Sequence, residues 1–541
     1  MFDGFAEDTW KVTPKFTLTA GVRYDIQLTP APGLVNHLFD PISSEYTSSI
    51  KNVTDRVQPR VAFSWAPWTG TVVRGGYGLF SALNQGSTYY AMRVENGVVQ
   101  LNYSYSGCEQ LVGAVKSTRC ATPPTTATNV MFPNLPFTPS GPPLSAALYP
   151  TGGNAPGVSA VTVTPSYSFH GLDPNFVPPL AHEMNLSVEQ AMPGKMSLQV
   201  GYVGTRGMRL PVFVDANLLG QTPHGLATYE VQDANNNITN SITVPVYLPT
   251  DRRNTALSSF NTGESVANTW YNSMAVTVRR PFTNGLEVLL NYTWAKATDT
   301  GQVQGANGTF YGGDVPSDPN NIRFDNGKSD INVTNRMTLS FVYQPKIMED
   351  NPWVKHILDD FQFSAEEIAS SGEPIFLGVS GTIYPGNTNS SSYADLSGIF
   401  GGAMSSSSGG ATSGRPPQIG RNSINMPGFN DFDLRVSRNV PIHDAMYMQF
   451  AADAFNILNH QIVTGVTSTY SSFLAPAAVG KVTSTLSYTC QTVAPPAGSR
   501  ETGCFVPYTG TGLSAFDVTS NTSSSNLYTA RQLQVSAKLF F

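Results

Sequence analysis

The chain is poor in charge and lacks long apolar runs. Only 13% of its 541 residues are charged and the formal net charge is −6, so the total predicts no surface for nucleic acid or another polyanion. No run of about 18 apolar residues occurs, which argues against a transmembrane helix. The start, Met1–Asp8, has neither the basic residues nor the apolar core of a signal peptide. Taken literally this start predicts a cytoplasmic protein, but the strand pattern described below favours a chain that is truncated at its amino end.

Motifs for catalysis, cofactors and metals are also missing. His182-Glu183 has no second histidine at the zincin spacing, and there is no G-x-S-x-G elbow or phosphate-binding loop. The acidic segment 325–330 departs from the EF-hand pattern and is better explained as an Asx-type turn. We therefore expect no enzyme, no cofactor and no metal site. A hydrolase whose catalytic residues converge from separate loops stays open, although nothing argues for it.

Cysteine is scarce, and its four residues fall into two long polar segments. Cys108 and Cys120 lie in one segment, and Cys490 and Cys504 lie in the other. If both segments are loops of an exported protein, two local disulfides are predicted, Cys108–Cys120 and Cys490–Cys504. Four free thiols or a metal site are the alternatives, but no spacing resembles the paired C-x-x-C of a zinc site.

Glycine, proline and aromatic residues are abundant: the chain has 48 glycines and 39 prolines, and 11% of its residues are aromatic. This composition is typical of strands and turns. The clearest strand is the last stretch, where alternate residues are apolar up to a terminal aromatic: Leu533, Val535, Ala537, Leu539 and Phe541. A soluble protein gains little from a free apolar edge, whereas a membrane barrel needs a last strand that pairs and faces lipid. Leu533, Val535, Leu539 and Phe541 also resemble the insertion signal of outer-membrane barrels, which would make the barrel-assembly machinery a partner. The alternative is the edge strand of a soluble sandwich.

The same alternation recurs along the whole chain. Thirteen strands are predicted, at residues 5–11, 16–27, 57–65, 71–80, 181–190, 195–205, 271–280, 286–296, 335–344, 361–369, 432–438, 446–455 and 531–541. A strand as long as 16–27 fits a tilted membrane crossing of about 9–11 residues better than a soluble strand of about 5–6. Short turns alternate with long polar connections, so one rim is tight and the other carries long loops, as in outer-membrane barrels. We therefore predict an all-β, antiparallel, up-and-down transmembrane β-barrel in the cell outer membrane, with long extracellular loops.

Tryptophan and the apolar faces agree with this prediction. All six tryptophans lie near a predicted strand end or in a connection, and we assign five to an aromatic girdle at the membrane boundary: Trp10, Trp65, Trp68, Trp270 and Trp294. The interior of a large barrel is polar, so the apolar faces should meet outer-membrane lipid. The residues predicted to point outward are Leu18, Val22, Val288, Leu290, Leu339, Val535 and Leu539.

Several stretches resemble the barrel of TonB-dependent receptors, specifically the Oar-like group: residues 7–14, 18–24, 59–65, 74–78, 199–204, 292–296, 428–434, 450–460 and 530–539. The resemblance implies an outer-membrane receptor that takes up a scarce, bulky ligand through a plugged barrel, driven by an inner-membrane energy-coupling complex. The ligand itself is unknown.

The strand count departs from that family, whose barrels have about 22 strands and are preceded by a signal peptide, a plug and a coupling motif. Thirteen strands would leave the first and last parallel, which simple antiparallel closure does not allow. Residues 1–541 are therefore expected to be a single domain, the carboxy-terminal part of a larger barrel, which meets the coupling complex only through upstream domains. Two alternatives stay open: a surface adhesin or structural barrel without transport, and a soluble multi-sheet binding protein.

Overall fold

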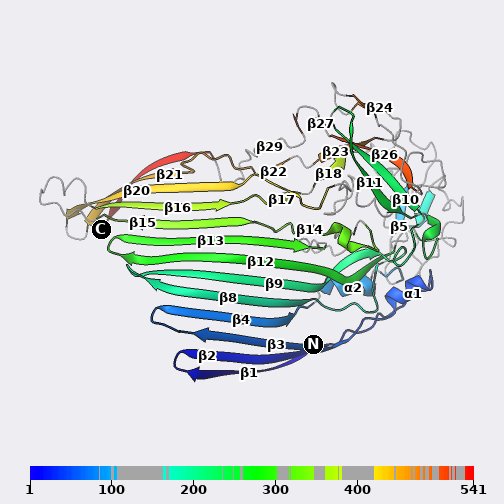
Figure 1. Cartoon of the computed structure of the whole chain (residues 1–541), viewed down its shortest axis with the longest axis horizontal. Helices are drawn as coiled ribbons and strands as arrows, with labels where there is room; N and C mark the ends of the chain where they lie inside the picture. The colour runs from blue at the N-terminus through cyan, green and yellow to red at the C-terminus, as the bar shows by residue number, and fades with distance from the viewer. Residues whose placement is uncertain are drawn as a thin grey trace, which may run out of the picture.

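One large antiparallel sheet dominates the computed structural model (Figure 1). The structure describes most of residues 1–541; left out are chiefly 107–161, 301–315, 346–359, 381–418, 475–478, 482–486, 490–498 and 521–529, with shorter gaps elsewhere. Thirteen strands pair in chain order: β1 (Phe2–Thr13), β2 (Phe16–Gln27), β3 (Val53–Trp65), β4 (Thr71–Ser81), β8 (Leu180–Met192), β9 (Met196–Asp215), β12 (Asn261–Thr283), β13 (Leu286–Asp299), β15 (Asn335–Tyr343), β16 (Phe361–Ser370), β20 (Phe429–His443), β21 (Met446–Phe455) and β30 (Gln532–Phe540). Each overlaps a predicted strand, so the all-β antiparallel prediction is confirmed.

The short connections are tight hairpins whose residues suit the turn. Asn284 and Gly285 join β12 to β13 with φ of 52° and 76°, the left-handed conformation that Asn and Gly adopt most readily. A Cβ at Gly285 would clash with the carbonyl oxygen of Gln344, the residue that follows β15. Glycine is therefore required at this position by the backbone conformation and by the packing of the adjacent strand.

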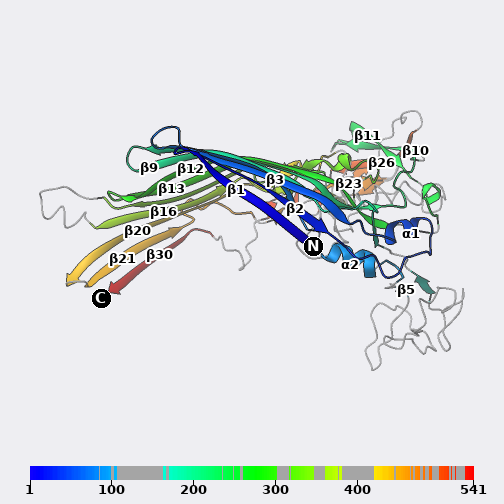
Figure 2. The same cartoon turned by 90° about the horizontal axis from the view of Figure 1, so that it is seen from below.

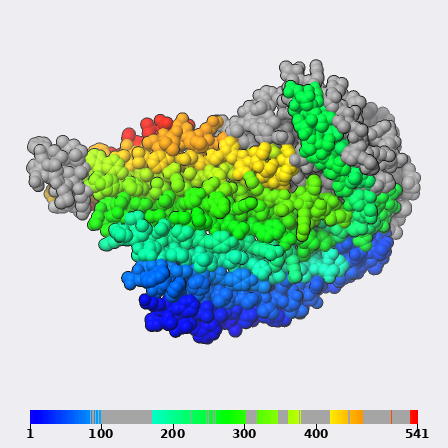
Figure 3. All heavy atoms as spheres, viewed as in Figure 1, coloured from blue at the N-terminus to red at the C-terminus, as the bar shows by residue number. Residues whose placement is uncertain are grey.

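Short and long connections lie at opposite ends of the sheet (Figure 1). The turns after β1, β3, β8 and β12 lie at one end, and the segments that follow β2, β4, β9 and β13 lie at the other. Consecutive strands form consecutive bands across the molecule (Figure 3). The predicted contrast between a tight rim and a loop-bearing rim is confirmed. We call the second rim the loop end.

The sheet is curved, with its central strands at the top of Figure 2 and both edge strands, β1 and β30, below them. Within the described residues β1 pairs only with β2, and β30 pairs only with β21. Because the count is odd and every neighbouring pair is antiparallel, the two edge strands run in the same direction. The described part of the sheet thus has two free edges.

The two faces of the sheet differ in polarity. On one face Asn291 joins three strands, because its Oδ1 accepts from the Thr277 hydroxyl at 3.0 Å and its Nδ2 donates to the Thr338 hydroxyl at 3.4 Å. Farther along the same face, Arg435 donates to Asp453 at 3.2 Å. The opposite face carries the apolar alternate residues. This sorting is what a barrel with a polar interior requires.

Strands β9 and β12 extend well beyond their predicted ends and pair as far as Asp215 and Asn261. The extension was missed because its residues do not alternate. In β9, the consecutive residues Val212, Phe213 and Val214 are all buried, so both faces of this stretch are covered. A strand buried on both sides is apolar throughout and gives no period-two signal.

The long connections also contain regular structure that the sequence analysis treated as polar loop. A five-stranded sheet runs β11 (Ile238–Val246), β10 (Gly225–Gln232), β26 (Ser499–Pro507), β23 (Thr469–Leu474) and β18 (Gly378–Ser380). The helices are α1 (Ile42–Thr47), α2 (Gly86–Val94) and the 3₁₀ turns η1 (Pro249–Asp251) and η2 (Ile322–Asp325). Short strands complete the loop end: β5 (Tyr103–Ser106), β6 (Thr162–Pro165), β7 (His170–Leu172), β14 (Gly327–Lys328), β17 (Pro374–Ile375), β19 (Ile424–Asn425), β22 (Gly465–Val466), β24 (Val479–Lys481), β25 (Ser487–Thr489), β27 (Thr509–Gly510), β28 (Leu513–Ser514) and β29 (Val518–Thr519). In the described part of the chain, no helix has the length and apolar character to cross a membrane.

Candidate ligand pocket at the loop end

Small hydrophobic clusters hold the loop end together, and two of them involve the helices α1 and α2. The first consists of Ile42, Tyr46, Ala216, Leu257 and Phe260. The second consists of Ile50, Met92, Leu172 and Phe176. They join α1, α2 and β7 to the ends of β9 and β12, so segments far apart in the sequence pack into one body. Burial of these apolar side chains is the main force that fixes the connections around the pocket described next.

Strand β7 places two carboxyl groups side by side. It runs parallel to the start of β12, with Leu172 opposite Gly263. A Cβ at Gly263 would lie 2.7 Å from the Leu172 side chain, so glycine permits this close approach. The amide of Asp173 then donates to the carbonyl oxygen of Gly263 at 3.0 Å. The next residue on β12, Glu264, therefore becomes a neighbour of Asp173.

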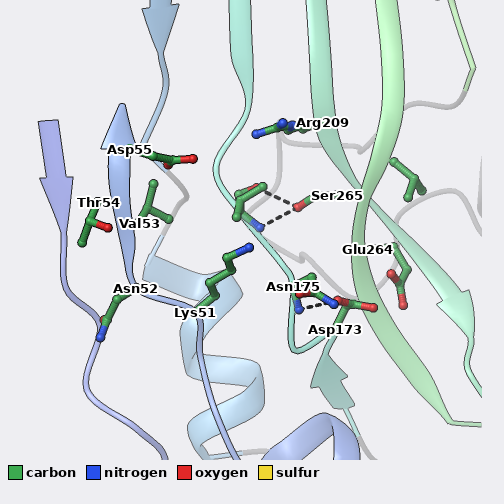
Figure 4. A pocket seen from close by; sticks show the side chains of 12 residues that line it. Lys51, Asn52, Val53, Thr54, Asp55, Asp173, Asn175, Arg209, Glu264 and Ser265 are labelled. Atoms are coloured by element: carbon green, nitrogen blue, oxygen red, sulfur yellow. Dashed lines mark hydrogen bonds between the residues drawn. The ribbon is translucent and has the colours of Figure 1, made fainter. Parts of the chain in front are cut away.

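A pocket of about 550 Å³ opens at this point (Figure 4). Its wall comes from the end of the α1–β3 connection and the start of β3, the connection after β7, the irregular part of β9, and the start of β12. The lining residues are Lys51, Asn52, Val53, Thr54, Asp55, Asp173, Asn175, Val177, Arg209, Glu264, Ser265 and Val266. The volume lies in the range usual for small-molecule sites.

Hydrogen bonds fix the wall of the pocket. Ser265 donates from Oγ to the carbonyl oxygen of Val177 at 2.7 Å, and its Oγ accepts from the Val177 amide at 2.9 Å. The amide of Asn175 donates to the Asp173 carboxylate. The connection after β7 is thereby held against β12, as the dashed lines in Figure 4 show.

The carboxyl of Glu264 is buried, and among the described residues no cation pairs with it. Glu264 lies in the extension of β12 beyond Trp270, outside the predicted membrane crossing, and is only 7% exposed. Burial, followed by the charge of Asp173 and a hydrogen bond with it, raises the pKa of Glu264 to about 9. Its Oε1 has no hydrogen-bond partner in the part of the chain that the structure describes. At neutral pH Glu264 is thus protonated beside the carboxylate of Asp173.

The remaining charges of the pocket balance. Lys51 and Arg209 supply two positive charges, and Asp55 and Asp173 supply two negative ones. Arg209 has φ of 58°, an uncommon conformation for a residue with a side chain, in the stretch of β9 where pairing with β12 is irregular. The arrangement can bind a polar ligand through both signs of charge. Among the described residues no cluster of three or more metal-binding side chains occurs.

An arginine contacts the acidic segment 325–330, which departs from the calcium-loop pattern. The buried Arg421 donates from Nε to the carbonyl oxygen of Asp325 at 2.9 Å and ion-pairs with Asp299. A second guanidinium nitrogen lies 3.9 Å from the Asp330 carboxylate. This guanidinium anchors the connection before β19 to the end of β13.

The predicted girdle residues lie at two levels of the sheet. Trp10, Trp65 and Trp68 lie near the short turns, where the rings of Trp65 and Trp68 are 6.5 Å apart. Trp294 is exposed and Trp270 half-buried, both toward the loop end. Trp353 lies outside the described residues. Contact with the membrane boundary stays a prediction.

The remaining predicted residues are only partly described. Cys504 is buried in β26 and disulfide-bonded, whereas Cys108, Cys120 and Cys490 lie outside the described residues, so both pairings stay predictions. In the last stretch, four predicted residues are exposed along and just after β30: Leu533, Val535, Leu539 and Phe541. Their role in insertion is likewise untested.

No pattern in the sequence indicates the pocket. Asp173 and Glu264 belong to different long connections, and neither connection has a motif that marks it. Only the parallel pairing of β7 with β12 brings them together. A usable signal was the apolar run at 212–214, which indicates a strand buried on both faces and hence a packed loop end.

Comparison with known families decides the class of this protein. A family described as "Outer membrane beta barrel domain" matches residues 1–491. The chain belongs to this family. The antiparallel sheet, the alternating loop lengths and the family together place the protein in the cell outer membrane. No curated protein matches the chain.

Solved structures similar to this outer-membrane barrel include iron-uptake receptors. FpvA of Pseudomonas aeruginosa, bound to pyoverdines, is 9% identical with a TM-score of 0.36. The match covers 86% of this chain and 35% of the FpvA chain. The ferric-catecholate import receptor Fiu of Escherichia coli K12 is 12% identical with a TM-score of 0.35, covering 85% and 40%. A mutant ferric enterobactin receptor of Pseudomonas aeruginosa is 11% identical with a TM-score of 0.37, covering 85% and 40%. The chain thus spans well under half the length of these receptors, and scores this low carry no argument about function.

Proposed function

We propose that this chain forms part of the wall of a TonB-dependent receptor that imports a bulky, scarce ligand. The observation that carries the proposal is the packed loop end, which holds a charged pocket of about 550 Å³ above a sheet with one polar face. In outer-membrane barrels the long loops are extracellular, so the pocket would meet ligand arriving from outside. The quoted stretches that resemble Oar-like receptors point the same way.

The wall is proposed to be the carboxy-terminal portion of a larger barrel. Two free edges that run in the same direction cannot pair with each other in an antiparallel barrel. Further strands between β30 and β1 would form hydrogen bonds with the unpaired backbone groups of the two edges. Each such group left unpaired in lipid costs roughly several kcal/mol. A plug and a coupling motif in that longer protein would connect it to the inner-membrane energy-coupling complex. The barrel-assembly machinery would recognise β30.

The second candidate is a surface adhesin or structural barrel without transport. The five-stranded sheet at the loop end favours it, because such a body could hold a partner without passing anything through the membrane. Both candidates share the outer-membrane location. They differ in whether the protein engages the energy-coupling complex.

Cross-linking of the full-length gene product in energised cells tests the proposal. A receptor should form a cross-linked product with TonB, and this product should disappear when the coupling motif upstream of residue 1 is deleted. An adhesin should give no such product while its surface display is unchanged. Absence of a plug-encoding sequence and of any TonB product would overturn the transport proposal and favour the adhesin.

A further inference from the structure

We propose that the loop-end pocket binds a small zwitterion, such as a short peptide with free ends, its ammonium at Asp173 and Glu264 and its carboxylate at Lys51 and Arg209. The inference deepens the transport function proposed above by naming the ligand class of its pocket, and its biological meaning rests on that function. The binding itself can be tested separately.

The carboxyl pair is suited to a cationic N–H donor. Glu264 is nine-tenths buried, lines the pocket and has an Oε1 without a hydrogen-bond partner among the described residues. A buried polar atom without a partner has lost its hydrogen bonds to water, so it calls for a donor. Asp173 beside it supplies negative charge. An ammonium carries three donors and a positive charge, so it would satisfy Oε1 and displace the proton that Glu264 holds.

The basic side chains are suited to an anion. Neither Lys51 nor Arg209 forms an ion pair within the described part of the chain, and Figure 4 shows Lys51 directed into the pocket. Arg209 also lies close enough to the buried Arg56 to help lower the pKa of that guanidinium, after the larger effects of burial, which lowers it, and of Asp55, which raises it. Two neighbouring guanidinium groups repel each other, and a carboxylate from the ligand would relieve that repulsion.

Size and charge balance narrow the ligand further. With Glu264 protonated, the free pocket carries equal numbers of positive and negative charges, so it offers groups of both signs to a ligand that is charged at both ends. The titratable groups that interact with Glu264 are Asp173 and, at longer range, Glu45 and Tyr46. Glu45 is itself paired with Arg253. A cavity of about 550 Å³ accommodates a peptide of a few residues. A divalent cation fits less well, because it needs more oxygen ligands than one carboxyl pair offers.

Calorimetry on the full chain in detergent micelles at pH 7 tests the inference with three probes. These are trialanine, N-acetyl-trialanine and trialanine amide, which differ only in which end is charged. We expect trialanine to bind at least tenfold more tightly than either blocked peptide. Equal affinity for all three, no binding of any, or tight binding of calcium alone would overturn the inference.

The number of protons released on ligand binding tests whether Glu264 contacts the ligand, because a residue with only a structural role would not change that number. Binding measured in buffers of different ionisation enthalpy should show close to one proton released by the wild type and none by Glu264→Gln. Affinity for trialanine should fall at least tenfold in Glu264→Gln and Asp173→Asn. The matched control is Glu183→Gln, an exposed carboxylate of β8 outside the pocket, which should change neither quantity.

The slower migration of heated samples in gels, typical of folded barrels, checks that each variant is folded. If Glu264→Gln does not fold, the proton count of the wild type and the Asp173→Asn variant still decide. Loss of zwitterion binding with intact cross-linking to TonB would overturn this inference alone. Zwitterion binding without any TonB product would overturn the transport function alone.

Discussion

At the scale of single residues, Glu264 makes the stability of the folded loop end depend on pH. The pKa of its carboxyl, about 9 in the fold against an ordinary 4.5, means that the folded state holds the proton more tightly than the unfolded chain. The stabilisation is therefore fully present below about pH 4.5 and is lost as the pH rises through 9. The cause is burial first and the neighbouring Asp173 second.

This gives a prediction about local stability. Amide hydrogen exchange in residues 170–177 and 261–266, corrected for its intrinsic pH dependence, should become faster as the pH is raised from 6 to 9. Glu264→Gln should remove most of this dependence, because glutamine has no proton to lose. Glu183→Gln should leave it unchanged. A pH dependence that persists in Glu264→Gln would show that another group is responsible.

A second residue-scale prediction concerns which face meets lipid. Leu290 lies between Val278 and Leu339 on the apolar face, so Leu290→Arg should destabilise the barrel by about 2–4 kcal/mol if it lies near the bilayer midplane. Thr338→Arg should cost little, because Thr338 is on the polar face with Asn291. Chemical denaturation in reconstituted bilayers measures both. Position 339 is less suitable for arginine, since Glu367 pairs across from Leu339 and could neutralise it.

Spin labels separate the membrane barrel from a soluble sheet, in which both substitutions could also be damaging. A label at position 339 should be relaxed by a lipophilic quencher, and a label at position 338 should not. Equal accessibility at the two positions, or none at either, would contradict the assignment of the faces.

At the scale of elements, β26 shows how the loop end is joined together. It pairs with β10 on one side and β23 on the other, so it links connections that lie far apart in the sequence. Cys504 on β26 is buried and disulfide-bonded. A disulfide there would hold the connection before β30 to this small sheet.

We predict that Cys504 pairs with Cys490, and Cys108 with Cys120. A bridge that closes so short a loop contributes about 3 kcal/mol by restricting the unfolded chain. Peptide mapping under non-reducing conditions identifies the pairs directly. Recovery of free thiols, or of a peptide joining Cys504 to Cys108 or Cys120, would show that the pairing is wrong.

At the scale of the whole molecule, the long antiparallel sheet and its two free edges determine how the protein behaves in solution. Unpaired strands and an apolar outer face need lipid and further strands, or they aggregate. We predict that the protein fractionates with the outer membrane and needs detergent to stay monodisperse. Density-gradient fractionation followed by size-exclusion chromatography checks this. Recovery as a soluble monomer without detergent or refolding would contradict it.

The alternation of apolar residues determined the thirteen main strands, their order and the contrast between the two rims. Residues 16–27 and 532–540 show why this worked: a strand with one apolar and one polar face leaves a period-two pattern, and short turns force neighbouring strands to pair. Only the tertiary structure decided the loop end. The extension of β9 through Val212 and Val214 is buried on both faces, so it has no such pattern, and the parallel pairing of β7 with β12 joins Asp173 to Glu264 across a long connection. Contacts between residues so far apart in sequence depend on packing in three dimensions, and no local sequence pattern predicts them.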